Sequence, residues 1–153
     1  LWPAPVLLLQ NEVPEAVNLA AAHAAKAQGA QVILNAAPAR VASDDLLVLV
    51  DVLVVNRVEA RMLSGEEGEA ALRALHAPGR AVILTRGAEG ALLLAEVGAL
   101  SDIPPTPVQA RSSHGAGDMF CGALAARLAA GDPLPAACAT ASRPAALFVS
   151  MTE

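Results

Sequence analysis

Short, mostly apolar runs alternate along this chain with longer stretches in a helical pattern. A run of this length bounded by turn residues is typical of a strand covered on both faces of its sheet. Strands that alternate with helices predict a largely parallel sheet between two helical layers. We therefore expect a Rossmann-like, three-layer α/β/α fold. Strands are expected at 6–9, 31–34, 52–55, 81–84 and 91–94, and helices at 14–28, 44–49, 56–64, 66–76, 115–130 and 134–149.

Three features depart from this simple alternation. A short glycine-containing turn separates the last two apolar runs, which predicts an antiparallel hairpin over residues 81–94. Residues 99–110 are broken by prolines and predict edge strands. Pro144 lies inside the last helical pattern and should kink it, because proline lacks a backbone N–H.

Composition excludes several classes of protein. The 153 residues are 55% hydrophobic and 2% aromatic with a net charge of −5, the reverse of a disordered chain. The acidic balance, the single lysine (Lys26) and the few aromatics argue against a nucleic-acid partner. The apolar runs are too short for a membrane span, and residues 1–10 lack a signal-peptide pattern.

Length and cysteine usage complete this picture. The length suits one α/β domain over residues 1–153. Cys121 and Cys138 lack the spacing of a metal or redox motif, so we expect buried, reduced thiols and a cytoplasmic location.

The glycine-rich turn Gly115-Ala116-Gly117-Asp118 opens a predicted helix. The first N–H groups of a helix have no partner within it, and the helix dipole favours negative charge there. The turn could therefore hold a phosphoryl group, and Asp118 beside it could accept a proton from an attacking hydroxyl. The alternative is an ordinary helix start with an aspartate that matches the dipole.

Two further motifs follow predicted strands. Asn56 and Glu59 share one face of a helical turn and could hold hydrated Mg²⁺ near phosphates. The alternative is a capping box at the start of a helix. Thr85, Gly87 and Gly90 lie between two apolar runs, where a hydroxyl beside glycines could seat the phosphates of a nucleotide, or simply form a hairpin turn.

Taken together and in this order, the motifs resemble the carboxyl-terminal half of the ribokinase-like (PfkB) carbohydrate kinases. The resemblance rests on Asn56-x-x-Glu59, Thr85-x-Gly87-x-x-Gly90 and Gly115-Ala116-Gly117-Asp118-x-Phe120. Residues 7–12 and 34–39 resemble the ribokinase branch of this family. The resemblance implies an incomplete ribokinase-like fold that lacks the amino-terminal part and the lid.

The resemblance also implies a reaction, namely ATP-dependent phosphorylation of a pentose, D-ribose at its 5-hydroxyl. Asp118 would be the general base, and Glu12 would contact the sugar. The N–H groups of Gly115, Ala116 and Gly117 would stabilise the transferring phosphoryl group.

The same resemblance assigns the nucleotide site and the metal. Asn56, Thr85, Gly87 and Gly90 would bind ATP, and Glu59 would help to place Mg²⁺. The family signature normally has Asp where this chain has Ser112, which puts activation by a monovalent cation such as K⁺ in doubt.

Other functions stay open at this point. The chain could be an inactive nucleotide-binding remnant, or a subunit that pairs with another chain or with a missing amino-terminal half. It could also be a kinase for another sugar or a nucleoside. Apolar surface left by the absent half would favour a homo-oligomer.

Overall fold

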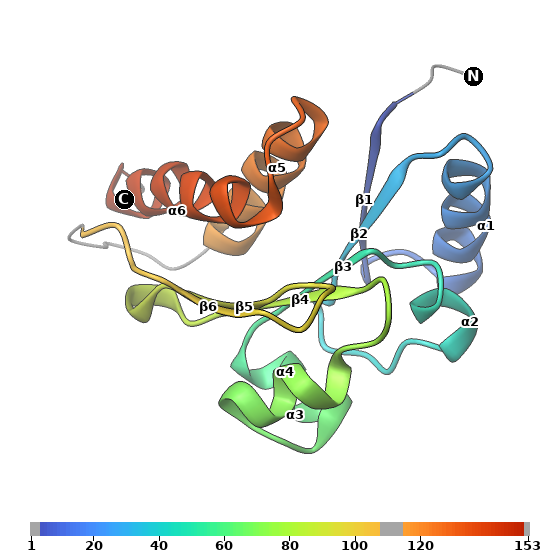
Figure 1. Cartoon of the computed structure of the whole chain (residues 1–153), viewed down its shortest axis with the longest axis horizontal. Coiled ribbons are helices and arrows are strands. Elements are labelled where there is room, and N and C mark those ends of the chain that lie inside the picture. The colour runs from blue at the N-terminus through green and yellow to red at the C-terminus, as the bar shows by residue number, and fades with distance from the viewer. Residues whose placement is uncertain (1–3, 108–114, 152–153) are drawn as a thin grey trace.

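A six-stranded sheet forms the centre of the protein (Figure 1). The computed structural model describes residues 4–107 and 115–151. The strands lie side by side in sequence order, β1 to β4 run parallel, and β5 and β6 are antiparallel to their neighbours. Their bounds are β1 Val6–Gln10, β2 Gln31–Asn35, β3 Val52–Val55, β4 Ala81–Thr85, β5 Ala91–Leu94 and β6 Leu100–Ile103.

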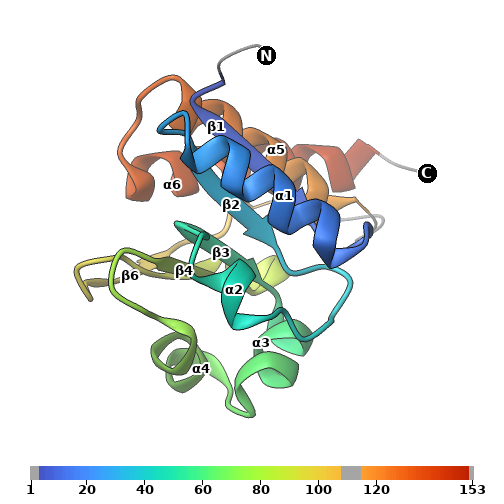
Figure 2. The same ribbon diagram turned by 90° about the vertical axis from the view of Figure 1, so that its right-hand side faces the viewer.

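Helices cover both faces of this sheet, so the fold has three layers (Figures 1 and 2). On one face pack α1 Glu15–Lys26, α2 Asp44–Leu47, α3 Arg57–Ser64 and α4 Gly68–Leu75. On the other face pack α5 Ala116–Ala129 and α6 Leu134–Met151. A short 3₁₀ turn, η1 Gly87–Glu89, joins β4 to β5.

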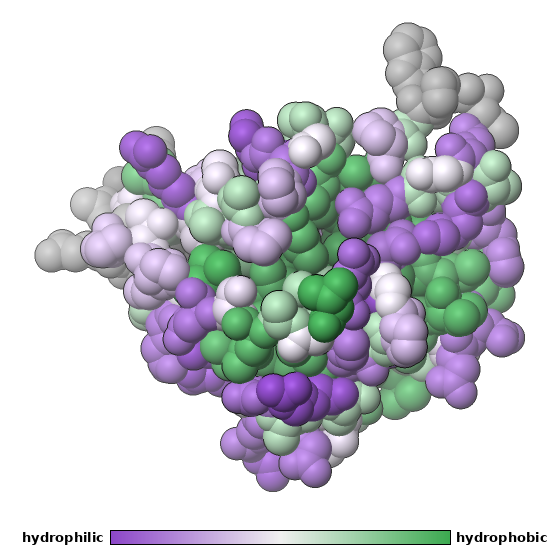
Figure 3. All heavy atoms as spheres, viewed as in Figure 1, coloured by the Kyte–Doolittle hydropathy of each residue, from purple (hydrophilic) through white to green (hydrophobic). Residues whose placement is uncertain are grey.

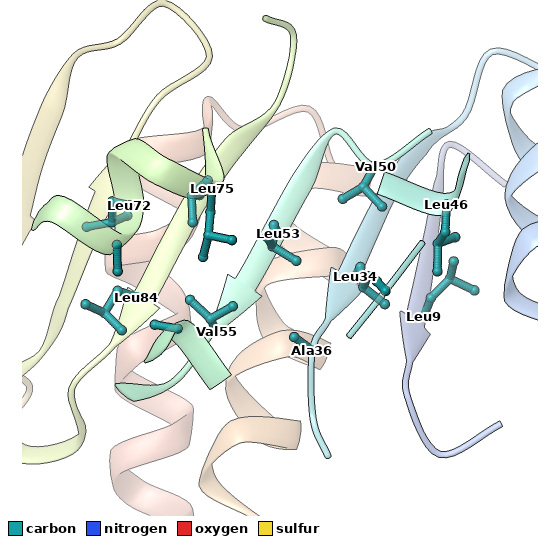
Figure 4. Packing of buried hydrophobic residues seen from close by; sticks show 14 of the residues in the cluster. Leu9, Leu34, Ala36, Leu46, Val50, Leu53, Val55, Leu72, Leu75 and Leu84 are labelled. Carbon is teal, nitrogen blue, oxygen red and sulfur yellow. The ribbon is translucent and has the colours of Figure 1, made fainter. Parts of the chain in front are cut away.

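Two hydrophobic clusters hold the layers together, because successive side chains of a strand point to opposite faces. Leu34, Leu53 and Val55 face the first helical layer, as Figure 4 shows, together with Leu46 of α2 and Leu72 of α4. The alternate strand residues pack against α5 and α6. Apolar residues also reach the surface in the middle of the face in Figure 3, with polar residues around them.

Most predicted elements are confirmed. The continuous apolar runs form β1 to β5, and the hairpin of β4 and β5 is antiparallel. Of the proline-broken segment, residues 100–103 form an edge strand, β6, while residues 108–110 lie outside the described part. Helix α6 includes Pro144 and continues past it to Met151.

The structure also bears on the two cysteines and on membrane-spanning helices. Cys121 and Cys138 are free and buried, as predicted. None of the helices in the described ranges is long and apolar enough to cross a membrane.

Candidate active site

The candidate residues gather where the parallel strands end. Because β1 to β4 are parallel, their carboxyl ends meet at one edge of the sheet, the usual ligand site of such folds. Gln10 ends β1, Asn56 follows β3, and Thr85 ends β4. Helix α5, which carries Asp118, packs against β1 on the opposite face from α3.

Helix α5 begins at a glycine in an unusual conformation. Gly115 has a φ of 75°, in the left-handed region that side chains disfavour. A Cβ atom added there would lie 2.8 Å from Cε1 of Phe148 in α6, so any larger residue would require this ring to shift. Among the described residues no side chain caps this helix, and its first N–H groups therefore face outward without a partner in the helix.

Asp118 lies in the first turn of α5 and is exposed. Its Oδ1 accepts a hydrogen bond from Nε2 of Gln10 at 2.8 Å. Gln10 belongs to the segment after the first apolar run, but sequence reasoning gave it no role. The signal that could have found it is strand alternation, since Val6, Leu8 and Gln10 share the face covered by α5.

Asn56 and Glu59 form a closed capping box at the start of α3. The Asn56 side chain accepts a hydrogen bond from the Glu59 backbone N–H at 3.0 Å. The Asn56 backbone N–H and Nδ2 each donate to a different Glu59 carboxylate oxygen, both at 2.8 Å. The structural interpretation of this motif is therefore confirmed, with every partner supplied by the motif itself.

Burial shapes the electrostatics of this motif. Glu59 is only 4% exposed, and desolvation raises the pKa of its carboxyl despite the two hydrogen bonds from Asn56. Burial also raises the pKa of the Cys121 thiol in α5 to about 12, and the negative charges of Asp118 and Glu59 add to this shift. The charges of Asp118 in α5 and Glu59 in α3 thus both disfavour ionisation of this thiol.

The turn after β4 is tied to the α3 motif. The Thr85 hydroxyl donates to the carbonyl of Val55, the last residue of β3, at 3.3 Å. Glu89 of the turn pairs with Arg57 of α3 at 2.6 Å, and the guanidinium lowers the pKa of Glu89. A Cβ at Gly90 would lie 2.1 Å from the carbonyl oxygen of Ile103, so the packing of β6 by itself requires this glycine.

We compared the sequence and the structure of this chain with those of known proteins. The sequence model of the pfkB family carbohydrate kinases matches residues 4–153. The chain belongs to this family.

The relatives that it resembles are ribokinases. The enzyme of Haemophilus influenzae is 37% identical over 129 residues, covering 80% of this chain and 42% of that protein. The enzyme of Mus musculus is 33% identical over 135 residues, covering 82% of this chain and 42% of that protein. Arabidopsis thaliana ribokinase, solved with ribose and ATP, matches with a TM-score of 0.88 and 27% identity over 97% of this chain and 51% of that one. The chain thus spans 42% of the length of the two curated relatives.

Two further residues were singled out by the family resemblance. Glu12 is exposed in the turn after β1, two residues beyond Gln10 and on the same edge of the sheet. Ser112, on which the expectation about a monovalent cation depends, lies outside the described residues.

The donor set suits a magnesium ion that phosphates share. Glu59 offers a buried carboxylate, and within residues 4–107 and 115–151 no basic side chain forms an ion pair with it. In the same ranges no cluster of three or more His, Cys, Asp or Glu could hold a metal alone. Mg²⁺ in phosphoryl-transfer sites binds through one or two carboxylates, water and the phosphates of the substrate. Glu59 offers a ligand of this type, but a metal ion would have to share its two oxygens with the hydrogen bonds from Asn56.

Proposed function

We propose that this chain carries the phosphoryl-transfer half of an ATP-dependent sugar kinase that acts on the 5-hydroxyl of D-ribose, with Asp118 as general base. In this proposal residues 1–153 are one α/β domain, the carboxyl-terminal half of a ribokinase-like kinase. The observation that carries it is an exposed carboxylate in the first turn of a helix that starts at a glycine and has no side-chain cap from residues 4–107 or 115–151. The names of the related enzymes support ribose as the sugar.

The proposed reaction is an in-line transfer. The 5-hydroxyl oxygen attacks the γ-phosphorus of ATP, and its proton moves to a carboxylate oxygen of Asp118. The bond between the γ-phosphorus and the bridging oxygen breaks, and ADP leaves with that electron pair. The products are ribose 5-phosphate, ADP and a proton that Asp118 passes to solvent.

The helix N-terminus supplies the electrostatic part of catalysis. The N–H groups of Gly115, Ala116 and Gly117 point toward the place where negative charge develops on the transferring group, and the α5 dipole adds to their effect. The glycine at the start of this turn lies against the ring of Phe148 in α6. Glu12, at the same edge of the sheet, would bind the sugar hydroxyls.

The nucleotide side of the site lies beside α3. Asn56, Thr85, Gly87 and Gly90 are proposed to contact ATP, and Glu59 to hold Mg²⁺ partly through water. Bound Mg²⁺ would neutralise charge on the β- and γ-phosphates. The contacts of Thr85 with Val55 and of Arg57 with Glu89 keep the two nucleotide-binding segments together.

A second candidate function follows from the sheet edge. β1 pairs only with β2 in the described sheet, and its other edge is open. An open apolar edge strand is a template for another strand. The chain could therefore bind nucleotide but require a second copy, or a separate amino-terminal half, to complete the sugar site.

The deciding experiment measures ADP release from Mg·ATP with and without D-ribose, together with ATP binding. We expect ribose-dependent turnover that falls about 10²–10⁴-fold in Asp118→Asn, because a positioned base contributes about that much. The matched control is Asp45→Asn, an exposed aspartate in the first turn of α2 on the opposite face of the sheet. That variant should keep wild-type turnover.

The outcomes separate the candidates. ATP binding without turnover would support the second candidate, and turnover restored by an added amino-terminal half would establish it. Turnover with another sugar or a nucleoside, but not with ribose, would reject ribose as the substrate and leave the proposed phosphoryl transfer unchanged. Neither binding nor turnover, with or without the added half, would reject both functions.

A further inference from the structure

Gln10 has a place in the fold that the proposed reaction does not yet use. It is the last residue of β1 and follows Val6 and Leu8 on the face that α5 covers. Its side chain reaches across to the first turn of α5, where Nε2 donates to Oδ1 of Asp118 at 2.8 Å. The two residues are 108 positions apart in the chain, so the folding of the α5 layer onto the sheet brings them together.

The backbone of Gln10 is held by buried polar groups. Its carbonyl oxygen accepts a hydrogen bond from Nδ2 of Asn18 in α1 at 2.8 Å, and Asn18 is only 1% exposed. The next residue, Asn11, is also buried, and its Nδ2 donates to the carbonyls of Ala36 and Pro38. Its backbone N–H donates to the carbonyl of Ala37 at 2.9 Å. The amide of Gln10 therefore extends from a fixed point, whereas Asp118 is an exposed side chain.

This geometry leaves the two oxygens of Asp118 unequal. Oδ1 is engaged by the Gln10 amide, and Oδ2 has no protein donor within the described residues. A carboxylate held through one oxygen loses rotational freedom about its terminal torsion, so the other oxygen keeps one direction. A base acts best when its accepting oxygen is held within hydrogen-bond reach of the proton.

We propose that Gln10 is a positioning residue for Asp118, holding Oδ1 so that Oδ2 faces the hydroxyl of the substrate. This inference rests on the proposed kinase function. Gln10 acts through Asp118 and needs no contact with the sugar or the nucleotide. A purely structural role is the competing explanation, but one hydrogen bond to an exposed carboxylate contributes little to stability.

The kinetic test replaces the amide by a side chain of similar length that cannot donate. In Gln10→Met we expect kcat to fall about 10–100-fold, with the KM values for sugar and Mg·ATP changed less than about twofold. In the Asp118→Asn background the same substitution should have no further effect, because residues that act as one unit are not additive. The matched control is Gln31→Met at the opposite end of the β1–β2 pair, which should leave kcat unchanged.

A second readout does not depend on turnover. The side-chain NH₂ protons of Gln10 can be followed by ¹H–¹⁵N NMR in the wild-type chain and in Asp118→Ala. We expect the proton that faces Asp118 to move upfield when its carboxylate acceptor is removed, while the side-chain signal of Gln31 stays in place. Thermal unfolding of Gln10→Met should match wild type closely, which separates positioning from folding.

The results distinguish this inference from the proposed function. An NMR shift together with a loss confined to kcat supports the positioning role. Wild-type turnover with an unchanged kcat in Gln10→Met, or with no NMR response to Asp118→Ala, overturns that role and leaves the kinase function intact. Absence of turnover in the wild-type chain, with or without an added amino-terminal half, rejects the kinase function and reduces the Gln10 contact to a structural one.

Discussion

Helices α3 and α5 begin near the same edge of the sheet, each with an acidic residue in its first turn, yet they begin in opposite ways. The start of α3 is closed, because Asn56 and Glu59 satisfy each other and Glu59 is buried. The start of α5 is open, because glycine replaces the cap and Asp118 is exposed. The side chains of a closed motif already have hydrogen-bond partners within the fold, whereas an open motif has donors and an acceptor available for a ligand.

Because of this difference, two motifs that look alike in sequence are not equally good candidates for ligand binding. Both carry an acidic residue near a helix N-terminus, where the dipole favours negative charge. At α3 both carboxylate oxygens of Glu59 already accept hydrogen bonds from Asn56, and a ligand would have to share these oxygens. At α5 only one oxygen of Asp118 is engaged, by Gln10. Under the proposed function, catalysis is therefore expected at α5, and the closed start of α3 would help to fix the shape of the nucleotide side.

The largest effect on stability is expected where the closed motif is broken. Asn56→Ala removes the N-cap of α3 and leaves the buried Glu59 with one hydrogen-bond donor fewer. We expect a loss of about 2–4 kcal/mol in the free energy of unfolding, measured by urea denaturation. The control is Ser43→Ala, which removes the N-cap of α2, a hydrogen bond from Leu46 at 3.3 Å, together with the side-chain hydrogen bond to Glu15, and should cost about 0.5–1 kcal/mol. Equal losses in the two variants would contradict the special weight given to the buried carboxylate.

The sequence predicted these motifs because each of them is local. A continuous apolar run marks a strand, and a glycine turn with an aspartate marks the start of a helix, within a few residues of chain. What it could not give depends on contacts between distant segments. Gln10 meets Asp118 across 108 residues, and Gly90 is required by the carbonyl of Ile103 in a different strand. The burial of Glu59 is also set by packing between distant segments, and this burial raises the pKa of its carboxyl.

A smaller effect is expected at the open motif. Gly115→Ala forces an alanine to a φ of 75° and places its Cβ against Phe148, so we expect a loss of about 1–3 kcal/mol by thermal unfolding. Gly117→Ala is the control, since nothing lies within 4 Å of a Cβ there and alanine favours the helix by up to about 1 kcal/mol. In a Phe148→Leu background the steric part of the Gly115→Ala cost should shrink, and the part due to φ should stay. A Gly115→Ala protein as stable as wild type would show that this turn is not fixed by its glycine.

The smallest effect concerns pH and the charge inside the closed motif. The raised pKa of Glu59 means that the folded protein binds more protons than the unfolded chain between the ordinary value of 4.5 and the raised one. The contribution of Glu59 to the free energy of unfolding is therefore largest at low pH and falls as pH rises through that window. Subtracting the profile of Glu59→Gln from that of wild type should give a curve that declines across the window and is flat above it.

Glu15, in the first turn of α1, provides the opposite case for the same measurement. Hydrogen bonds from Ser43 lower the pKa of its half-buried carboxyl, so the folded protein binds fewer protons than the unfolded chain just below pH 4.5. The stabilisation that Glu15 provides is present above that pH and is lost as pH falls through the lowered pKa. The wild-type profile minus that of Glu15→Gln should therefore rise with pH just below pH 4.5, whereas the Glu59 difference declines above pH 4.5. If both difference curves rise with pH, the carboxyl of Glu59 is not desolvated in solution. The contrast between the closed start of α3 and the open start of α5 would then rest on hydrogen bonding alone.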